Sequence, residues 1–309
     1  MSFKYDKLFI LAQNRGFNKT QLRQKADIST ATLAKLSKNE PVGMEVIEKL
    51  CICLKCQPGD IMSYEWETAN QLLRTLREEK NMNLPGGIYH TTQVKLAYNS
   101  NHIEGSRLSE EQTRYIFETN TIGVEADKAS VNVDDIIETN NHFDAFRYLL
   151  DVAEEDLSEK LVKEFHRILK SGTSDSRKDW FRVGDYKLKP NMIGDRETSQ
   201  PEQVETDMKK LLWDYHRKKE HNIEDIVRFH YHFERIHPFQ DGNGRVGRLL
   251  LFKECLKNNH VPIIIEDRFK QFYYRGLNEY ERETGYLVDT CLNEQDMYRK
   301  LLDYYKIEI

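Results

Sequence analysis

The twelve residues 237–248, His-Pro-Phe-Gln-Asp-Gly-Asn-Gly-Arg-Val-Gly-Arg, decide both the local fold and the chemistry that this chain can support. Upstream, residues 223–234 place apolar side chains at helical spacing, and Pro238 is unsuited to continuing that helix. Downstream, residues 245–257 carry a second apolar set at helical spacing. The stretch therefore predicts a helix, a loop and a second helix, with the glycines where the second helix begins.

The start of that second helix is suited to binding phosphate. The first turn of a helix has N–H groups without internal partners, and the helix dipole there favours negative charge. Gly242 and Gly244 carry no Cβ, so the backbone can approach an anion closely. Arg245 and Arg248 are three residues apart and project from one side of the helix, and arginine forks match phosphate oxygens.

Two further residues of the stretch add reactive chemistry. Asp241 offers the hard oxygen that Mg²⁺ prefers, and His237 can be neutral near pH 7 and accept a proton from a hydroxyl. The combination indicates attack of a hydroxyl on a phosphate of a nucleotide. The alternative interpretation is a glycine-rich turn with solvated arginines. A lone Gly-x-Gly would not exclude that alternative, but the complete twelve-residue string is a far more specific indication of nucleotide chemistry.

The string resembles the Fic motif, His-Pro-Phe-x-Asp/Glu-Gly-Asn-Gly-Arg-x-x-Arg, and matches it at every specified position. Fic proteins usually transfer AMP from ATP to a Ser, Thr or Tyr hydroxyl of another protein. The resemblance implies that His237 is the general base, that Asp241 binds Mg²⁺ and that Phe239 anchors the loop in the core. It also implies nucleotide phosphate contacts from Gly242, Asn243, Gly244, Arg245 and Arg248.

A second motif lies in a helix expected over about residues 91–105. Ser100-x-x-x-Glu104-Gly105 resembles the inhibitory motif found N-terminal to the core of many Fic proteins. There the glutamate pairs with the second motif arginine, here Arg248, so that ATP binds in a non-productive pose. Taken alone, Glu104 before a glycine is an ordinary helix end, but the downstream motif favours inhibition.

Two weaker resemblances concern the rest of the site. Residues 180–194 give the one convincing β signal and resemble in position the Fic flap, a hairpin that holds the target's hydroxyl segment as an added strand. A hairpin without a substrate role is the alternative. In the Fic fold Tyr273 or Tyr274 would line the adenine pocket, and core packing is an equal alternative for both. The expected flap residues are Lys189, Pro190, Asn191, Met192 and Ile193.

Residues 1–63 form a separate basic module. They hold ten Lys and Arg against six Asp and Glu, a net of +4, which leaves −9 for the remainder of a chain whose total is −5. Four short helices and the pattern Ile-Ser-x-x-Thr-Leu-x-x-Leu over 28–36 resemble the Cro/repressor-type helix-turn-helix. The third helix would then enter the major groove of DNA, and protein contact is the alternative. The implied DNA-contacting residues are Ser29, Thr30, Thr32, Lys35 and Lys38.

Composition restricts the remaining possibilities. A chain of 309 residues suggests two domains, and no apolar run approaches the roughly 20 residues that span a membrane. The N-terminus lacks the apolar core of a signal peptide, and five cysteines, an odd number, do not indicate a disulfide framework. Cys51, Cys53 and Cys56 lack the fourth ligand of a structural zinc site. We expect a cytoplasmic protein that has no membrane contact.

The sequence thus predicts a mainly α protein. It comprises a helix-turn-helix domain over 1–63, a linker helix over 64–89, and a Fic domain over 90–309 with one β-hairpin and a helical tail. The expected activity is Mg²⁺-dependent AMP transfer from ATP to a target protein, with DNA bound through residues 1–63. Three alternatives stay open: AMP removal, a different nucleotide-linked donor, and a DNA-bound regulator whose Fic domain is silent. The tail, 294–309, leaves dimerisation open, and with it a homo-oligomer.

Overall fold

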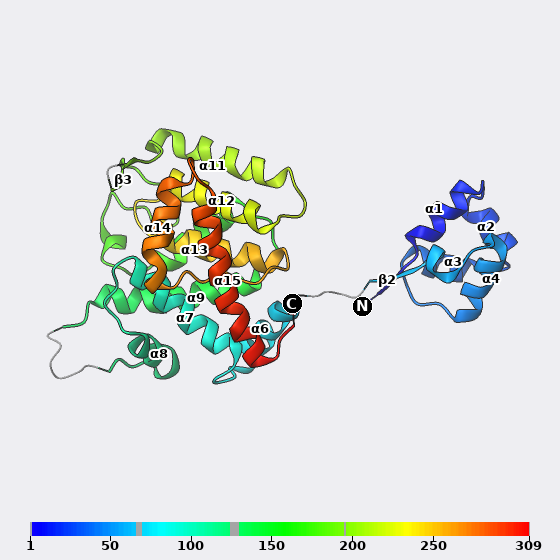
Figure 1. The fold of residues 1–309 in the computed structure, drawn as a ribbon, viewed down its shortest axis with the longest axis horizontal. Helices are drawn as coiled ribbons and strands as arrows, with labels where there is room; N and C mark the ends of the chain where they lie inside the picture. The colour runs from blue at the N-terminus through cyan, green and yellow to red at the C-terminus, as the bar shows by residue number, and fades with distance from the viewer. Residues whose placement is uncertain (1, 66–69, 124–129, 195, 309) are drawn as a thin grey trace. The chain divides into compact units, whose positions relative to one another are not determined.

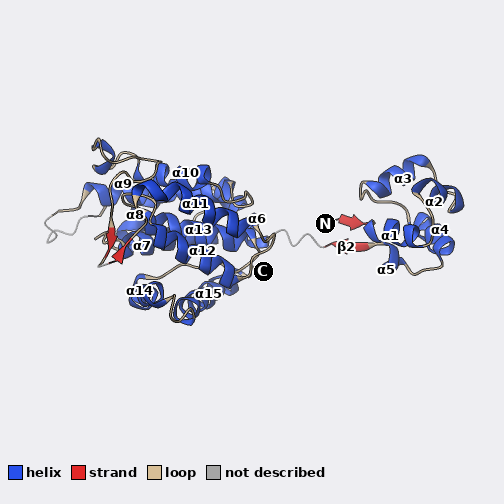
Figure 2. Cartoon of the chain, turned by 90° about the horizontal axis from the view of Figure 1, so that it is seen from above, coloured by secondary structure: helices blue, strands red, loops and turns tan. Residues whose placement is uncertain are grey.

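The computed structural model describes residues 2–65, 70–123, 130–194 and 196–308. The chain forms two compact units, Met1–Ala69 and Asn70–Ile309. Helices make up nearly all of the regular structure in each unit, and the strands are short (Figure 2). The expectation of a mainly α protein is confirmed.

The first unit is a small bundle of helices around leucine side chains. Leu8, Leu22, Leu36 and Leu50 are each 0% exposed, because every helix turns one apolar stripe toward the others. The side chain of Asn18 caps the second helix in a reciprocal capping box with Gln21. The five helices are α1 (Asp6–Asn14), α2 (Lys19–Lys25), α3 (Thr30–Ser37), α4 (Met44–Leu54) and α5 (Pro58–Ile61).

A two-stranded antiparallel sheet joins the ends of this unit, which the sequence did not predict. Strand β1 (Ser2–Lys4) pairs with β2 (Ser63–Glu65), with Phe3 opposite Tyr64. Strands of three residues are too short to show alternation of apolar and polar positions. The linker expected over 64–89 falls partly on residues 66–69, which lie outside the described residues.

The second unit is built around one buried helix, α13 (Asn243–Lys257), whose residues Asn243 to Leu256 are all buried. It packs against α7, α9, α10 and α12, and Figure 1 shows it in the interior of this unit. A helix that is buried on all sides must place any charged residue beside an internal partner. The buried Arg245 and Arg248 of this helix must therefore pair with other charged or polar groups, and these groups form the site described below.

The remaining helices surround α13. Ser109 and Ser158 cap α8 and α10, as their spacing to the following helices predicted. The helices are α6 (Gln71–Met82), α7 (Ile88–Ile103), α8 (Glu110–Thr119), α9 (Val133–Asp151), α10 (Glu159–Lys170), α11 (Pro201–His216), α12 (Ile223–Ile236), α14 (Lys270–Glu279) and α15 (Gly285–Tyr305), with short 3₁₀ helices η1 (Asp175–Arg177) and η2 (Asp267–Phe269). None of the helices in the described ranges is long and apolar enough to cross a bilayer.

The C-terminal helix α15 supports α7 from outside. The hydroxyl oxygens of Tyr298 and Tyr305 lie 2.7 Å from those of Thr92 and Thr91 respectively. Leu302 is buried in the same core. The tyrosines and leucines of the tail thus position the helix that carries Ser100 and Glu104.

The extended stretch expected over 180–194 is mostly irregular loop with turns and bends, so the prediction was wrong in extent. Only β3 (Met192–Ile193) is a strand, and it pairs with β4 (Arg196–Glu197) in a hairpin of two residues a side. The backbone N–H of Lys187 donates to Pro238 O at 2.9 Å, and that of Lys189 to Gln240 Oε1 at 3.3 Å. This segment therefore bonds to the loop after α12, which apolar alternation does not reveal.

Candidate active site

His237 ends α12 in a left-handed backbone conformation, with φ 52° and ψ 61°. Its N–H donates to Phe233 O at 3.0 Å, and Pro238 directs the chain out of the helix. Burial lowers the pKa of the imidazole to about 4, and the nearby Lys187 ammonium lowers it further while Glu104 opposes. Nδ1 is buried and has no hydrogen-bond partner among the residues that the structure describes. The imidazole is therefore neutral at pH 7 and able to accept a proton.

The loop after His237 is held by the side chains of Phe239 and Asn243. Phe239 is 0% exposed and stacks on His166 with ring centroids 4.0 Å apart and planes 2° apart. The N–H of Phe239 donates to Asn243 Oδ1 at 2.7 Å, and Asn243 Nδ2 donates to Phe239 O at 2.8 Å. The Asn243 side-chain amide thus fixes the loop through two hydrogen bonds. Since both polar atoms of the amide are used, any phosphate contact at this residue would come from its backbone N–H.

Gly242 and Gly244 occupy positions where a side chain would not fit. Gly242 has φ 79° as the N-cap of α13, a conformation that favours glycine. A Cβ on Gly244 would collide with Oε1 of Glu104 and lie close to Arg248. The Glu104 carboxylate therefore lies over the first turn of α13, where free N–H groups favour an anion.

Asp241 belongs to a charge cluster that the sequence did not reveal. Lys170, 2% exposed, places Nζ 2.6 Å from Asp241 Oδ2, 2.6 Å from Glu138 Oε1 and 3.6 Å from Asp175 Oδ2. Arg245 joins Asp241 at 3.1 Å and also pairs with Glu138. Burial opposes ionisation of Asp241, but Arg245 and Lys170 outweigh it and hold the pKa of that carboxyl below its usual range.

Arg248 is joined to the residues of the second motif. Its Nη2 lies 2.7 Å from Glu104 Oε1 and donates to Ser100 O at 2.8 Å, and its Nε donates to Ser100 Oγ at 3.0 Å. Arg248 is 2% exposed and Ser100 1%, whereas the Glu104 side chain is 31% exposed. Gly105, with φ 99°, follows the end of α7. The structure thus brings together residues 144 positions apart in the chain.

The two tyrosines expected at the adenine lie in different surroundings. Tyr273 is 1% exposed, and its hydroxyl oxygen lies 2.8 Å from Nε2 of His230. Tyr274 is exposed, and its hydroxyl donates to Ile103 O at 3.1 Å. Tyr273 is thus a core residue behind Arg248, and Tyr274 alone has surface available to a ligand.

The expected flap residues lie beside the loop that follows His237. Met192 and Ile193 are exposed in β3, and Lys189 and Pro190 are exposed before it. Asn191 Nδ2 donates to Phe239 O at 2.9 Å. The hairpin is therefore attached to the loop through Asn191, and the side chains of β3 are exposed.

Residues far from the motif complete the site. His166 and Lys170 are polar residues four positions apart on the otherwise apolar, buried face of α10. Two polar residues on an apolar helix face were a signal in the sequence that could have identified them as site residues. Glu138 and Lys187 follow no pattern of spacing. Glu234, one turn before His237, is buried, and its Oε1 has no hydrogen-bond partner within the described ranges. Burial raises the pKa of its carboxyl to about 8.

In the first unit, the residues expected at DNA lie on α3 and next to it. The Ser29 hydroxyl caps α3 by accepting from Thr32 N at 3.0 Å, and its oxygen lies 2.8 Å from Thr32 Oγ1. Thr30, Lys35 and Lys38 are exposed. Two of the five expected contacts therefore also stabilise the helix that carries them.

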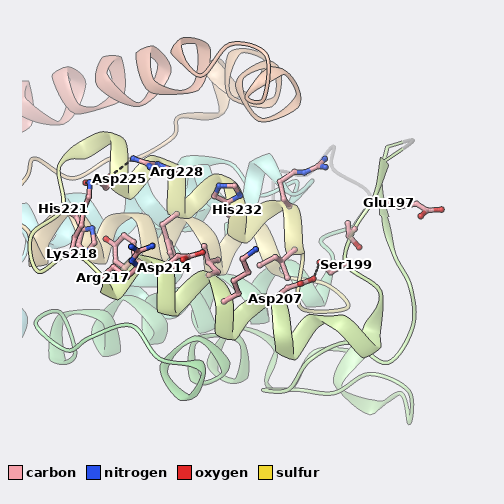
Figure 3. A pocket seen from close by; sticks show the side chains of 17 residues that line it. Glu197, Ser199, Asp207, Asp214, Arg217, Lys218, His221, Asp225, Arg228 and His232 are labelled. Atoms are coloured by element: carbon pink, nitrogen blue, oxygen red, sulfur yellow. Dashed lines mark hydrogen bonds and ion pairs between the residues drawn. The ribbon is translucent and has the colours of Figure 1, made fainter.

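A hollow of about 830 Å³ lies between α11 and α12. Figure 3 shows their side chains facing one another, with Ser199 at one end and His221 at the other. Asp225 binds both Lys218 and Arg228 at 2.7 Å. None of residues 237–248 lines this hollow, so it is distinct from the loop that the motif forms.

Comparison with known proteins agrees with the Fic motif and with the helix-turn-helix pattern of the first unit. Residues 156–254 match the Fic/DOC family, and residues 7–67 match the Cro/C1-type HTH DNA-binding domain. Protein adenylyltransferase Fic of Nematostella vectensis is 29% identical over 192 residues, which cover 59% of this chain and 42% of that protein. Its namesake in Drosophila melanogaster is 28% identical over 188 residues, covering 58% and 36%. The chain spans less than half the length of these curated relatives.

Solved structures show the same fold. Fic-1 (residues 134–508) of C. elegans has a TM-score of 0.60 at 19% identity, covering 96% of this chain and 92% of that one. A Fic family protein from Desulfovibrio desulfuricans has a TM-score of 0.56 at 22% identity, covering 80% and 78%. The resemblances to the Fic family and to the Cro/repressor-type helix-turn-helix are thereby confirmed.

Proposed function

Since the chain carries a Fic/DOC-family domain and a Cro/C1-type helix-turn-helix domain, we propose that it is a protein adenylyltransferase held inactive by Glu104. The reaction moves AMP from ATP to a Ser, Thr or Tyr hydroxyl of a target protein. The observation that carries the proposal is the loop itself. It joins a neutral, buried His237 to the free N–H groups at the start of α13.

The residues divide the chemistry between them. His237 takes the proton of the target hydroxyl as its oxygen forms a bond to the α-phosphorus of ATP. The bond from that phosphorus to the bridging oxygen breaks, and pyrophosphate leaves. The N–H groups around Gly242 and Gly244 hold the phosphates, and Arg245 and Arg248 bind the more distal oxygens.

Asp241 is the residue that would hold Mg²⁺. Its side chain is 45% exposed, and Lys170 and Arg245 contact Oδ2, so Oδ1 is the oxygen that would bind a metal. In the described ranges no group of three or more His, Cys, Asp or Glu could hold a metal alone. A single carboxylate is nevertheless suited to Mg²⁺, which commonly takes one or two carboxylates together with substrate phosphates. Mg²⁺ bound there supplies positive charge to the phosphate oxygens.

Glu104 supplies the proposed inhibition in two ways. It binds Arg248 at 2.7 Å, so the guanidinium is not available to the γ-phosphate. Its carboxylate also lies over Gly244, in the anion-binding space of the first turn of α13. ATP can then enter only in a pose that turns the α-phosphate away from the attacking hydroxyl.

Removal of AMP is a second candidate, supported by the position of the Glu104 carboxylate. This carboxylate is 31% exposed and lies beside the anion site, where it could orient a water molecule for attack on an adenylylated side chain. The two activities respond oppositely to Glu104→Gly, since that variant frees a transferase but deprives a hydrolase of its water-orienting group.

We further propose that the first unit binds DNA. Its net charge of +4 contrasts with an acidic remainder, and Thr30, Lys35 and Lys38 are exposed along α3. This function would place the Fic domain on a chosen DNA sequence, and the alternative remains a protein contact through the same surface.

The test of the transferase is His237→Ala. We expect addition of AMP to fall by about 10²–10⁴-fold, the usual contribution of a general base. Intact-protein mass spectrometry reads AMP on the chain and on target proteins, and calorimetry should show that ATP binding is retained. AMP addition at the wild-type rate in His237→Ala would remove the imidazole from the mechanism.

A further inference from the structure

Lys187 is a buried cation without a carboxylate partner among the described residues. It is 3% exposed, and its Nζ donates to Asn191 Oδ1 and Thr198 Oγ1, both at 2.7 Å, and to Ile236 O at 3.5 Å. All three acceptors are neutral. Burial lowers the pKa of the ammonium to about 8. A charge kept in such surroundings is costly, so its position calls for a reason beyond packing.

The first clue is that Lys187 contacts the backbone on both sides of His237. Its ammonium reaches the carbonyl of Ile236, the residue before, and its own N–H donates to the carbonyl of Pro238, the residue after, at 2.9 Å. His237 lies between them in a left-handed conformation that a residue with a side chain adopts rarely. Lys187 therefore holds the backbone that fixes the place of the imidazole.

The second clue is that the same lysine closes the base of the hairpin. Asn191 directly precedes β3, and Thr198 directly follows β4. The Thr198 hydroxyl oxygen lies 3.0 Å from Asn191 O and 2.6 Å from Asn191 Oδ1. Asn191 also donates to the carbonyl of Phe239. The hairpin and the loop after α12 are thus joined through one buried group of polar side chains.

We propose that Lys187 is a positioning residue that holds the hairpin and the His237 loop as one unit, so that a segment paired with β3 presents its hydroxyl to the imidazole. This inference rests on the proposed transfer reaction. It assigns a role to a residue outside the motif, and it explains why the lysine bonds to neutral oxygens. A carboxylate partner would neutralise the charge that faces His237.

The charges that face His237 come from three parts of the chain. Lys187 from the segment before β3 favours the neutral imidazole, whereas Glu104 after α7 and Asp241 in the loop favour the protonated form. Removing the Lys187 charge leaves both carboxylates unopposed there. The imidazole should then take up a proton at a higher pH.

A simpler account is that Lys187 only satisfies carbonyls at the C-terminal end of α12, where cations are generally favourable. That role would lower the stability of the folded protein when the lysine is replaced. Loss of the charge would shift the His237 midpoint in either account. The two accounts are therefore separated by Thr198→Val, which keeps the ammonium but removes one hairpin acceptor, and which should alter the His237 ring signals only if Lys187 joins the hairpin to the loop.

The experiment compares Lys187→Met and Lys187→Arg in the full chain, with Lys160→Met as the control at an exposed lysine on α10. The NMR titration of the His237 ring, assigned by its loss in His237→Ala, needs no activity. We expect Lys187→Met to raise its midpoint by roughly one pH unit, the size expected for loss of one neighbouring charge. Lys187→Arg and Lys160→Met should leave the midpoint in place.

Kinetics supply the second readout. In Lys187→Met we expect the acidic limb of the plot of transfer rate against pH to move to higher pH. We also expect the KM for the protein target to rise by a factor at least as large as the factor by which kcat falls. An unchanged His237 midpoint in a folded Lys187→Met protein overturns the proposal. If that variant does not fold, Thr198→Val removes one acceptor and tests the same coupling. If no variant transfers AMP, the proposed function fails, and the His237 ring signals in Thr198→Val still decide the role of Lys187.

Discussion

Breaking the ion pair between Glu104 and Arg248 has a predictable effect on stability. Removing one partner of a fully buried pair typically costs about 3–5 kcal/mol, because the other charge stays buried. Arg248 is 2% exposed, but it keeps two hydrogen bonds to Ser100, and Glu104 is 31% exposed. We therefore expect Glu104→Gly to lower the free energy of unfolding by only about 1–2 kcal/mol.

The assay is thermal unfolding of the full chain followed by circular dichroism. For a unit of this size 1 kcal/mol corresponds to about 2–4 °C in Tm, so Glu104→Gly should lower the Tm of the second unit by roughly 2–8 °C. The increase in Tm on adding ATP should be similar in both proteins, because the gain concerns the pose of the nucleotide and not its affinity.

A double-mutant cycle isolates the pair. Glu104→Gln keeps the shape and an acceptor oxygen but removes the charge, and Arg248→Met keeps most of the volume. The coupling energy of the two changes should be about 1 kcal/mol or more. A coupling energy near zero would mean that the ion pair between Glu104 and Arg248, 2.7 Å apart, does not stabilise the folded protein. The proposal that Glu104 inhibits the site by holding Arg248 would then lose its physical basis.

Three further predictions follow from charge. If residues 1–63 bind DNA through phosphates, affinity should fall steeply with salt in gel-shift titrations, and Lys35→Ala or Lys38→Ala should weaken it; no binding at low salt would favour a protein contact. Lys170→Met should tighten Mn²⁺ binding, measured by EPR with ADP present, since the ammonium 2.6 Å from Asp241 competes with the metal; weaker binding would contradict this. Stability should be highest near pH 6.5. Below that pH stability falls, because His142, His166, His230 and His237 have pKa values lowered to about 3 or 4 and stay neutral in the folded protein, whereas the unfolded chain takes up protons at these residues. Above it stability also falls, because Glu234 and Glu294 have pKa values raised to about 8 and stay protonated in the folded protein, whereas the unfolded chain has released these protons. Chemical denaturation from pH 5 to 8 checks this, and stability that rises steadily to pH 8 would refute it.

The sequence predicted those parts of the fold that depend on local physics. Helix periodicity and caps such as Ser109 and Ser158 act within a few residues, so they can be read directly. The motif loop was predictable for the same reason, since its twelve residues carry their own turn chemistry. The pairing of Glu104 with Arg248 came from a family resemblance, because no spacing rule joins residues 144 positions apart.

The parts that the sequence did not predict depend on tertiary contact. Lys170 and Glu138 meet Asp241 only because α9, α10 and α13 pack together. Residues 180–194 looked extended, yet the backbone N–H of Lys187 and the side chain of Asn191 bond to the loop after α12 instead of to a long partner strand. Strand β1 pairs with β2 across the length of the first unit. In each case the decisive partner is distant in sequence and has no distinctive local pattern.

The central claim is AMP transfer restrained by Glu104, and the most direct measurement uses ATP labelled on either the α- or the γ-phosphate. Wild type, Glu104→Gly and Glu104→Gly with Arg248→Ala are incubated with each ATP and Mg²⁺, and label on protein is counted. If the freed Arg248 stabilises the transition state, and not the bound ATP, by one charge-assisted contact of about 1.5–3 kcal/mol, α-label should increase about 10–150-fold in Glu104→Gly. It should return toward the wild-type level in the double variant, with no γ-label in any sample. Label that stays at the wild-type level in Glu104→Gly, or that comes from the γ-phosphate, would contradict the account.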